Sequence, residues 1–406
     1  MKNITGLRHG GVVSKSVIAV IVAATFLMSG FFVPNMVLAV GEGVNISVAT
    51  GGEAVSIDTS SASSTSAYTT LDPINISETI LGQITVGTHT ISLPNGWEFN
   101  TSAHITAIKG DGLVLSSYNI TPDTTSFSFT VNTSSTVSTF LVLSGMEVRP
   151  TVTNIADANG EMTHSGAAIA GVTDGSTSFG TLTSVPGTIT KLAFTTQPGA
   201  TTVYGSDLST QPVVVTQDQF SNDSSTGATG KTVTLSVDSA TVTGTALLDI
   251  SSGTATFTDV SIDTVGTYQF TASADSITRA DSNSFDVTQK GLTVSGLSAT
   301  SRPYDGTTTA EVTGTPSLVG TVGGDDVSVV GTANGPFDSA DAGGRTVEIS
   351  GLSLAGADSG NYTLTLPTLD SSITAKEVTV TPDSGQNKVY GEADSVFTDT
   401  NTALIG

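Results

Sequence analysis

Residues 232–237 read Thr-Val-Thr-Leu-Ser-Val, and this strict alternation of hydroxyl and aliphatic side chains decides the fold class. The same period of two returns at residues 267–272, where Tyr268, Phe270 and Ala272 alternate with polar residues. Successive side chains of a β-strand point to opposite faces, so these segments predict strands with one apolar face and one hydroxyl-bearing face. No amphipathic helix of useful length interrupts this pattern. We therefore predict an all-β chain of tandem sandwich domains that follows a helical N-terminal signal.

Length, charge and composition restrict the class of protein. A chain of 406 residues is long enough for about two to four domains, each with its own core. Lys and Arg total 13 against 36 Asp and Glu, and the resulting net charge of -23 would repel nucleic acid. Cysteine is absent, which excludes disulfides and Cys-based zinc sites. We predict no cofactor and no nucleic-acid partner.

The first 39 residues have the three parts of a secretory signal peptide. Three basic residues fall within the first 15, residues 17–33 carry no charge, and Val-Leu-Ala at 37–39 offers a cleavage site. This start predicts a protein that is secreted or displayed on the cell surface. The alternative is an uncleaved membrane anchor, because residues 16–33 are nearly long enough to span the hydrocarbon of a bilayer.

Composition and turn signals divide the remainder of the chain. Residues 40–72 are rich in Ser, Thr, Ala and Gly, so we expect a flexible lead-in that contains at most one edge strand, around Val44 to Val48, with order beginning near Ile74. Trp97, the only tryptophan, is expected to pack in a core or at its rim, and the alternative is a platform on which a glycan stacks. The predicted divisions are the signal peptide 1–39, the lead-in 40–72, a β-sandwich 73–187, an Ig-like domain 188–289, a further β domain 290–375 and a partial domain 376–406.

An ordered set of motifs between residues 191 and 287 resembles the bacterial Ig-like repeats of invasin-type surface proteins. It comprises Lys-Leu-Ala-Phe-Thr-Thr-Gln-Pro at 191–198, Asp-Gln-Phe-Ser-Asn at 218–222, Gly-Thr-Tyr at 266–268 and Ser-Phe-Asp-Val at 284–287. The resemblance implies a sandwich in which Tyr268 occupies the tyrosine-corner position.

A second set of motifs resembles the YDG repeat of large bacterial adhesins and haemagglutinin-like proteins. It includes Tyr-Asp-Gly at 304–306, with the basic Arg302 two residues before it, Gly-Asp-Asp at 324–326 and Asp-Ser-Gly-Asn-Tyr at 358–362. We expect Tyr304 and Tyr362 to pack in a core and the glycines of these turns to adopt positive φ.

Residues 388–391, Lys-Val-Tyr-Gly, resemble the opening of an MBG repeat, which typically follows YDG repeats. Because about 30 residues supply only two or three short strands, we expect the chain to stop inside this domain. Tyr390 and Phe397 should then be largely exposed.

Site candidates are few. Calcium favours clustered carboxylates, which makes Asp325 and Asp326 weak calcium candidates, but we prefer a plain turn because no Asp-x-Asp-x-Asp-Gly loop is present. His89 and His104 could bind a metal ion only if their strands met. No nucleophile-elbow motif frames a serine, and we predict no catalytic residue.

These observations predict a non-catalytic, exported adhesin or structural stalk. Its partner would be an unidentified protein or glycan at a surface, and membrane contact would occur only through the signal segment or an anchor beyond Gly406. The alternatives are a structural component of a surface layer or exoprotein, and the non-catalytic portion of a larger exported enzyme.

Overall fold

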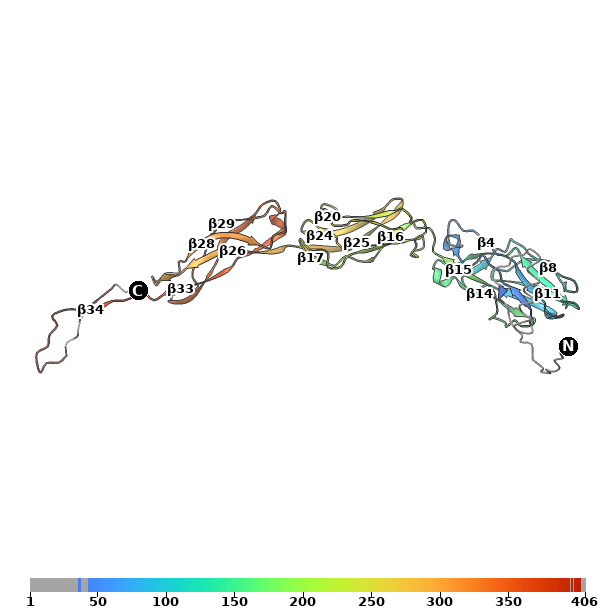
Figure 1. Ribbon diagram of the computed structural model, residues 1–406, viewed down its shortest axis with the longest axis horizontal. Coiled ribbons are helices and arrows are strands. Elements are labelled where there is room, and N and C mark those ends of the chain that lie inside the picture. The colour runs from blue at the N-terminus through green and yellow to red at the C-terminus, as the bar shows by residue number, and fades with distance from the viewer. Residues whose placement is uncertain (1–35, 38–42, 395, 397, 403–406) are drawn as a thin grey trace, which may run out of the picture. The chain divides into compact units, whose positions relative to one another are not determined.

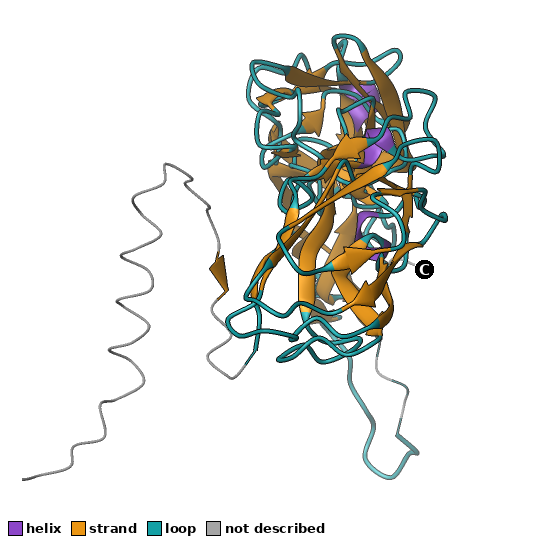
Figure 2. Ribbon diagram, turned by 90° about the vertical axis from the view of Figure 1, so that its right-hand side faces the viewer, coloured by secondary structure: helices purple, strands orange, loops and turns teal. Residues whose placement is uncertain are grey.

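The computed structural model describes residues 36–37, 43–394, 396 and 398–402, so most of the predicted signal segment lies outside the described residues. Every regular element in the described part is a strand or a 3-10 helix of three residues (Figure 2). The three short helices are η1 (Ile57–Thr59), η2 (Ile155–Asp157) and η3 (Ser359–Asn361). The all-β prediction is confirmed, and no helix among the described residues is long and apolar enough to cross a bilayer.

The chain forms two compact units. The first contains Met1–Ile189 with Gln217–Thr226, and the second contains Thr190–Thr216 with Gly227–Gly406. Figure 1 labels their strands along the chain.

The first unit contains two six-stranded sheets and a smaller sheet of three strands. The first large sheet has the order β1 (Met36–Val37), β2 (Asn45–Ser47), β5 (Ile74–Ser77), β12 (Phe140–Ser144), β8 (Ile105–Lys109) and β10 (Asn119–Ile120). The second has the order β3 (Val55–Ser56), β15 (Ser178–Val185), β14 (Asn159–Gly166), β6 (Gly87–Ser92), β11 (Ser126–Thr133) and β9 (Val114–Leu115). The small sheet has the order β4 (Thr69–Thr70), β13 (Glu147–Pro150) and β7 (Trp97–Phe99).

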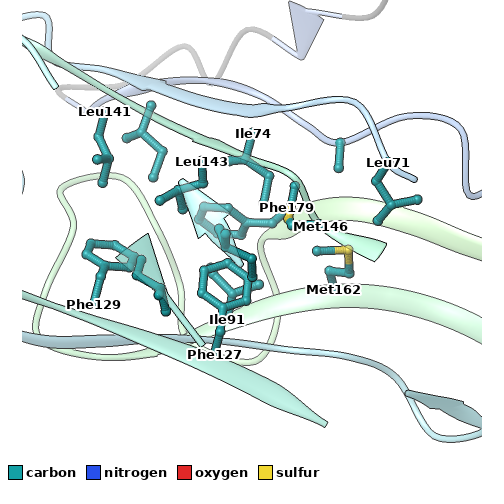
Figure 3. Close-up of a cluster of buried hydrophobic side chains, with 14 of the residues drawn as sticks. Leu71, Ile74, Ile91, Phe127, Phe129, Leu141, Leu143, Met146, Met162 and Phe179 are labelled. Atoms are coloured by element: carbon teal, nitrogen blue, oxygen red, sulfur yellow. The ribbon is translucent and has the colours of Figure 1, made fainter. Parts of the chain in front are cut away.

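Alternating residues of these strands build the core of the first unit. Ile74 and Leu143 of one large sheet and Ile91 and Phe127 of the other belong to a single buried cluster (Figure 3). Trp97 is 2% exposed and belongs to the same cluster, as expected. The period of two in the sequence thus corresponds to the inward face of each strand.

The predicted flexible lead-in is the main difference from the sequence analysis. Strand β2 pairs with β5, and Val44, Ile46 and Leu71 are buried in the core of the first unit. The chain also approaches the β14–β15 connection so closely that a Cβ on Gly43 would lie 2.7 Å from the Ala170 carbonyl oxygen. Order therefore begins by residue 43. The many Ser and Thr residues of this segment suggest flexibility, whereas in the structure some of their hydroxyls bond to the backbone, as Ser60 Oγ does to the Val152 carbonyl oxygen at 2.9 Å.

The second unit begins with a module that we call the first module, strands β16 to β25. Its main sheet has the order β21 (Leu247–Asp249), β19 (Thr232–Ser236), β24 (Gly266–Ala274), β25 (Ile277–Thr288), β16 (Lys191–Thr196), β18 (Val213–Gln217) and β22 (Thr254–Thr256). Strand β17 (Thr201–Val203) pairs with β25, and β20 (Val242–Thr243) pairs with β23 (Ser261–Ile262). Buried residues from strands far apart in this order, such as Val214 on β18 and Phe270 on β24, pack together in one core. This packing gives an Ig-like sandwich.

The second module follows as strands β26 to β33. Its sheets are β28 (Glu311–Val319), β26 (Lys290–Thr300) and β32 (Tyr362–Thr365); β27 (Arg302–Pro303), β33 (Thr368–Thr374) and β30 (Gly343–Glu348); and the pair β29 (Ser328–Asn334) and β31 (Ser350–Ala355). Its own core contains Val294, Phe337, Val347 and Ile373.

Beyond the second module, β34 (Val380–Pro382) pairs only with β35 (Asp399–Asn401). Both strands are exposed along their length, and Tyr390 is fully exposed at 103%. The expected exposure of Tyr390 is therefore observed. Phe397 lies outside the described residues.

Candidate functional site

The Tyr-Asp-Gly segment of the second module forms a hydrogen-bonded turn. Asp305 Oδ1 accepts a hydrogen bond from the Thr307 backbone N–H at 2.9 Å, and Arg302 pairs with the same carboxylate. The Thr307 hydrogen bonds, followed by the Arg302 interactions, lower the pKa of Asp305. Gly306 has a φ of 79°, as expected for this turn, because glycine adopts positive φ without strain.

Asp325 lies in the loop between β28 and β29 and contacts two tyrosines. Its Oδ2 accepts a hydrogen bond from Tyr204 Oη at 2.9 Å and another from Tyr362 Oη. Tyr362 Oη in turn accepts a hydrogen bond from the Val322 backbone N–H at 2.9 Å. Because Tyr204 belongs to the first module and Tyr362 to the second, we call these three residues, Tyr204, Asp325 and Tyr362, the tyrosine–aspartate joint.

Asp326 has a different role from its neighbour. Its backbone N–H donates to Asp358 Oδ2 at 2.8 Å, and its Oδ2 accepts from the Ala357 N–H at 3.1 Å. These reciprocal bonds connect the 320–327 loop to the turn before η3. The turn interpretation thus describes Asp326 well, whereas Asp325 bonds outside its own loop.

Apolar packing surrounds the tyrosine–aspartate joint. The rings of Tyr204 and Tyr362 meet edge to face, with centroids 5.4 Å apart at 82°. Both tyrosines and Leu292 of the second module belong to the buried cluster of the first module. A Cβ on Gly205 would lie 2.3 Å from Val322 Cγ2, so the two modules are in close contact here.

The backbone connection between the modules is one residue long. Strand β25 ends at Thr288 and β26 begins at Lys290, which leaves only Gln289 between them. Gln289 Nε2 donates to the carbonyl oxygens of Gly360 at 2.9 Å and Tyr362 at 3.1 Å. Asn361 Oδ1 also accepts from the Val265 N–H of the first module at 3.0 Å. Linker and joint together hold the second module against the first.

One family model matches a part of the chain. Residues 288–370 match the YDG domain. They coincide closely with the second module, which is called the YDG module below. No curated protein matches the chain.

Solved structures of modular proteins are similar to the chain at low sequence identity. The I-band fragment I67-I69 from titin is 13% identical over 72% of this chain and 100% of that chain, with a TM-score of 0.23. Invasin, a bacterial integrin-binding protein, is 12% identical over 85% of this chain and 63% of that chain, with a TM-score of 0.26. The Ig-like description given above rests on the strand pairing.

Burial and hydrogen bonding keep the two tyrosines of the joint neutral. Burial raises the pKa of Tyr204 and of Tyr362, and the hydrogen bonds to Asp325 raise both further. A neutral phenol can donate to a carboxylate, whereas a phenolate cannot. Both tyrosines therefore remain donors to Asp325 throughout the physiological pH range.

The two calcium candidates do not point to a shared centre. Asp325 Oδ2 is engaged by two tyrosine hydroxyls, and Asp326 Oδ2 by a backbone N–H. Across the described ranges, no group of three or more His, Cys, Asp and Glu side chains is arranged to hold a metal ion. The carboxylates act here as hydrogen-bond acceptors.

The metal hypothesis requires His89 to lie near His104, but His89 has a different partner. His89 contacts His164, with 3.1 Å between Nδ1 and Nε2, and His104 is an exposed residue near Thr121. His89 and His104 are therefore not brought together as a pair.

Sequence reasoning missed both the His89–His164 contact and the role of Tyr204. Sequence motifs indicated Asp325 and Tyr362 separately, but no short spacing connects them to Tyr204, which lies in the other module.

Proposed function

We propose that this chain is a non-catalytic, exported surface protein whose sandwiches form a structural stalk. The observation that supports it best is the tyrosine–aspartate joint. Domains in one chain are by default mobile relative to each other unless a substantial apolar interface holds them. A linker of one residue, a shared apolar cluster and hydrogen-bonded tyrosines favour a fixed spacing, which is the property that a stalk needs.

Adhesion is a second candidate function, favoured by the outer face of the first large sheet. Ile108 is exposed on β8 and Phe140 on the neighbouring strand β12. Aromatic side chains at a surface are frequent anchors for protein or glycan ligands. Binding of the purified chain to host cells would distinguish an adhesin from a stalk without ligand.

The stalk proposal predicts one narrow distance between the two modules of the second unit. Because the chain has no cysteine, Thr232→Cys and Ser353→Cys would place one spin label on an exposed position of each module. Double electron–electron resonance should give a single narrow distance distribution. Adding Asp325→Ala should broaden it, because both tyrosine hydroxyls lose their acceptor.

The matched control is Asp370→Ala, which removes an exposed carboxylate from the YDG module without touching the joint. It should leave the distribution narrow. A broad distribution in the labelled parent, or no effect of Asp325→Ala, would contradict the stalk proposal.

Export predicts a mature protein that begins near Val40. The basic start, the uncharged stretch 17–33 and the small residues before position 40 are the features that a signal peptidase requires. Expression of the full chain in a bacterial host, followed by N-terminal sequencing of the envelope and culture fractions, checks this. Recovery of intact Met1 in the membrane fraction would support the uncleaved anchor instead.

A further inference from the structure

Two histidines lie inside the apolar core of the first unit. His89 on β6 is 0% exposed and His164 on the adjacent β14 is 1% exposed. The His89 ring stacks on Phe129 at 5.0 Å, and the His164 ring lies 6.0 Å from Phe179. Buried ionisable groups among aromatic rings are costly unless hydrogen bonds satisfy them, so their pairing requires an explanation.

The two rings form the middle of a continuous hydrogen-bonded chain. His89 Nε2 lies 2.8 Å from the Thr85 carbonyl oxygen, and His89 Nδ1 lies 3.1 Å from His164 Nε2. His164 Nδ1 lies 2.7 Å from Asp174 Oδ1. The Asp174 side chain is about half exposed, at 54%, so the hydrogen-bonded series reaches solvent at this carboxylate.

The number of hydrogens that these three contacts require determines the charge on the two rings. The Thr85 carbonyl and the Asp174 carboxylate can only accept, so each terminal contact requires an N–H from a ring. The central contact requires one further hydrogen between the two facing nitrogens. Three hydrogens on four ring nitrogens is one more than two neutral imidazoles carry.

We propose that His89, His164 and Asp174 form a relay that stores one proton in the core at neutral pH and makes the first unit sensitive to acid. The additional proton resides on His164, next to its carboxylate counterion, because imidazole is ordinarily far more basic than a carboxylic acid. His89 is then neutral, donating from Nε2 to Thr85 and accepting at Nδ1. Among the described residues, His164 and Asp174 are the ionisable groups that act on His89, and β11 and β15 present phenylalanines to the rings.

A second proton breaks the relay. With four hydrogens on four nitrogens, two N–H groups face each other across the central contact, and two cations share an apolar site. Burial lowers the pKa of His89 below its ordinary value. In the unfolded chain His89 accepts a proton near its ordinary pKa of about 6.5, so the unfolded state binds more protons below that pH. The stability that neutral His89 contributes to the first unit is thus fully present above about pH 6.5 and declines as the pH falls toward the pKa of folded His89.

Nitrogen NMR of the full-length mature protein, labelled with ¹⁵N-histidine, tests the relay directly. The chain has four histidines and His9 lies in the predicted signal peptide, so the mature protein should give three rings with two ¹⁵N signals each. His104→Gln identifies the signal of the exposed residue. At pH 7 we expect one remaining ring with both nitrogens protonated and one neutral ring with its hydrogen on Nε2. Two neutral rings at pH 7 would overturn the proposal.

A variant series separates proton storage from packing. Asp174→Asn removes the counterion but keeps a hydrogen-bond acceptor, so the ring that carries hydrogens on both nitrogens at pH 7 in the parent should be replaced by a neutral ring. His89→Gln removes the site of the second proton. Trp97, the only tryptophan, lies in this core, so its fluorescence follows unfolding of the first unit alone.

In urea titrations between pH 6.5 and pH 5, the midpoint for Trp97 should fall with pH in the parent and in His104→Gln. It should fall less in His89→Gln. Equal pH dependence in parent and His89→Gln would overturn the acid-sensing role. If His89→Gln does not fold, the NMR measurement on the parent still decides the proposal.

Discussion

Tyr362→Ala is expected to lower the free energy of unfolding of the second unit by about 3–5 kcal/mol, the usual cost of truncating a buried aromatic residue. Tyr362 is 3% exposed, packs edge to face on Tyr204 and belongs to the shared cluster of the two modules. The truncation leaves a cavity and removes a hydrogen-bond donor from Asp325. Near-ultraviolet circular dichroism during urea unfolding would measure the change.

The matched control is Tyr390→Ala, because this tyrosine is fully exposed beyond the YDG module. It should change stability by less than about 0.5 kcal/mol. Tyr362→Phe keeps the ring and isolates the hydroxyl, whose loss leaves the Val322 N–H without this acceptor and should cost about 1–3 kcal/mol. If Tyr362→Ala had no more effect than Tyr390→Ala, the joint would not stabilise the second unit.

The sequence predicted the strands of the two modules because their signal is local. Alternation at 232–237 and 267–272 corresponds to the buried residues Val233, Leu235, Tyr268 and Phe270 on β19 and β24. The Tyr-Asp-Gly motif predicted a turn at residues 304–306, and the positive φ of Gly306 agrees with it. Such features depend on neighbours within a few residues, which is why a single sequence reveals them.

The lead-in was misjudged because its contacts are not local. Residues 43–72 contain few large side chains, and low hydrophobicity ordinarily indicates that a segment cannot offset its loss of conformational entropy. Here the strands β5 and β15 already provide paired edges and a core. The segment is therefore held by pairing with these strands and by the burial of a few apolar side chains, those of Val44, Ile46 and Leu71, in the core of the first unit.

The joint and the histidine relay could not be predicted for the same reason. Tyr204 and Asp325 are 121 positions apart, and His89 and His164 are 75 positions apart. Nothing in the residues around Tyr204 distinguishes it from other tyrosines of the chain. The sequence indicated Asp325 because two adjacent carboxylates stand out in a chain with only 12% charged residues, but it could not show which groups they meet.

The two units have separate cores, which gives the second large prediction. Phe127 on β11 is 1% exposed and packs edge to face on Phe99, with ring centroids 5.5 Å apart at 72°. Phe127→Ala should lower the free energy of unfolding of the first unit by about 3–5 kcal/mol, because the cavity left among Ile91, Phe99 and their neighbours has no side chain to fill it.

Trp97 fluorescence reports this loss selectively, since the chain has no other tryptophan. The Trp97 transition of Phe127→Ala should move to lower urea, while the tyrosine signal of the second unit keeps its midpoint. Phe140→Ala is the control, because it truncates the same residue type on the same unit at a position 41% exposed, where little packing is lost. The reverse selectivity is expected of Tyr362→Ala. A shift of both transitions by either substitution would mean that the two cores unfold as one cooperative unit, and the fluorescence of Trp97 would then follow the stability of the whole chain.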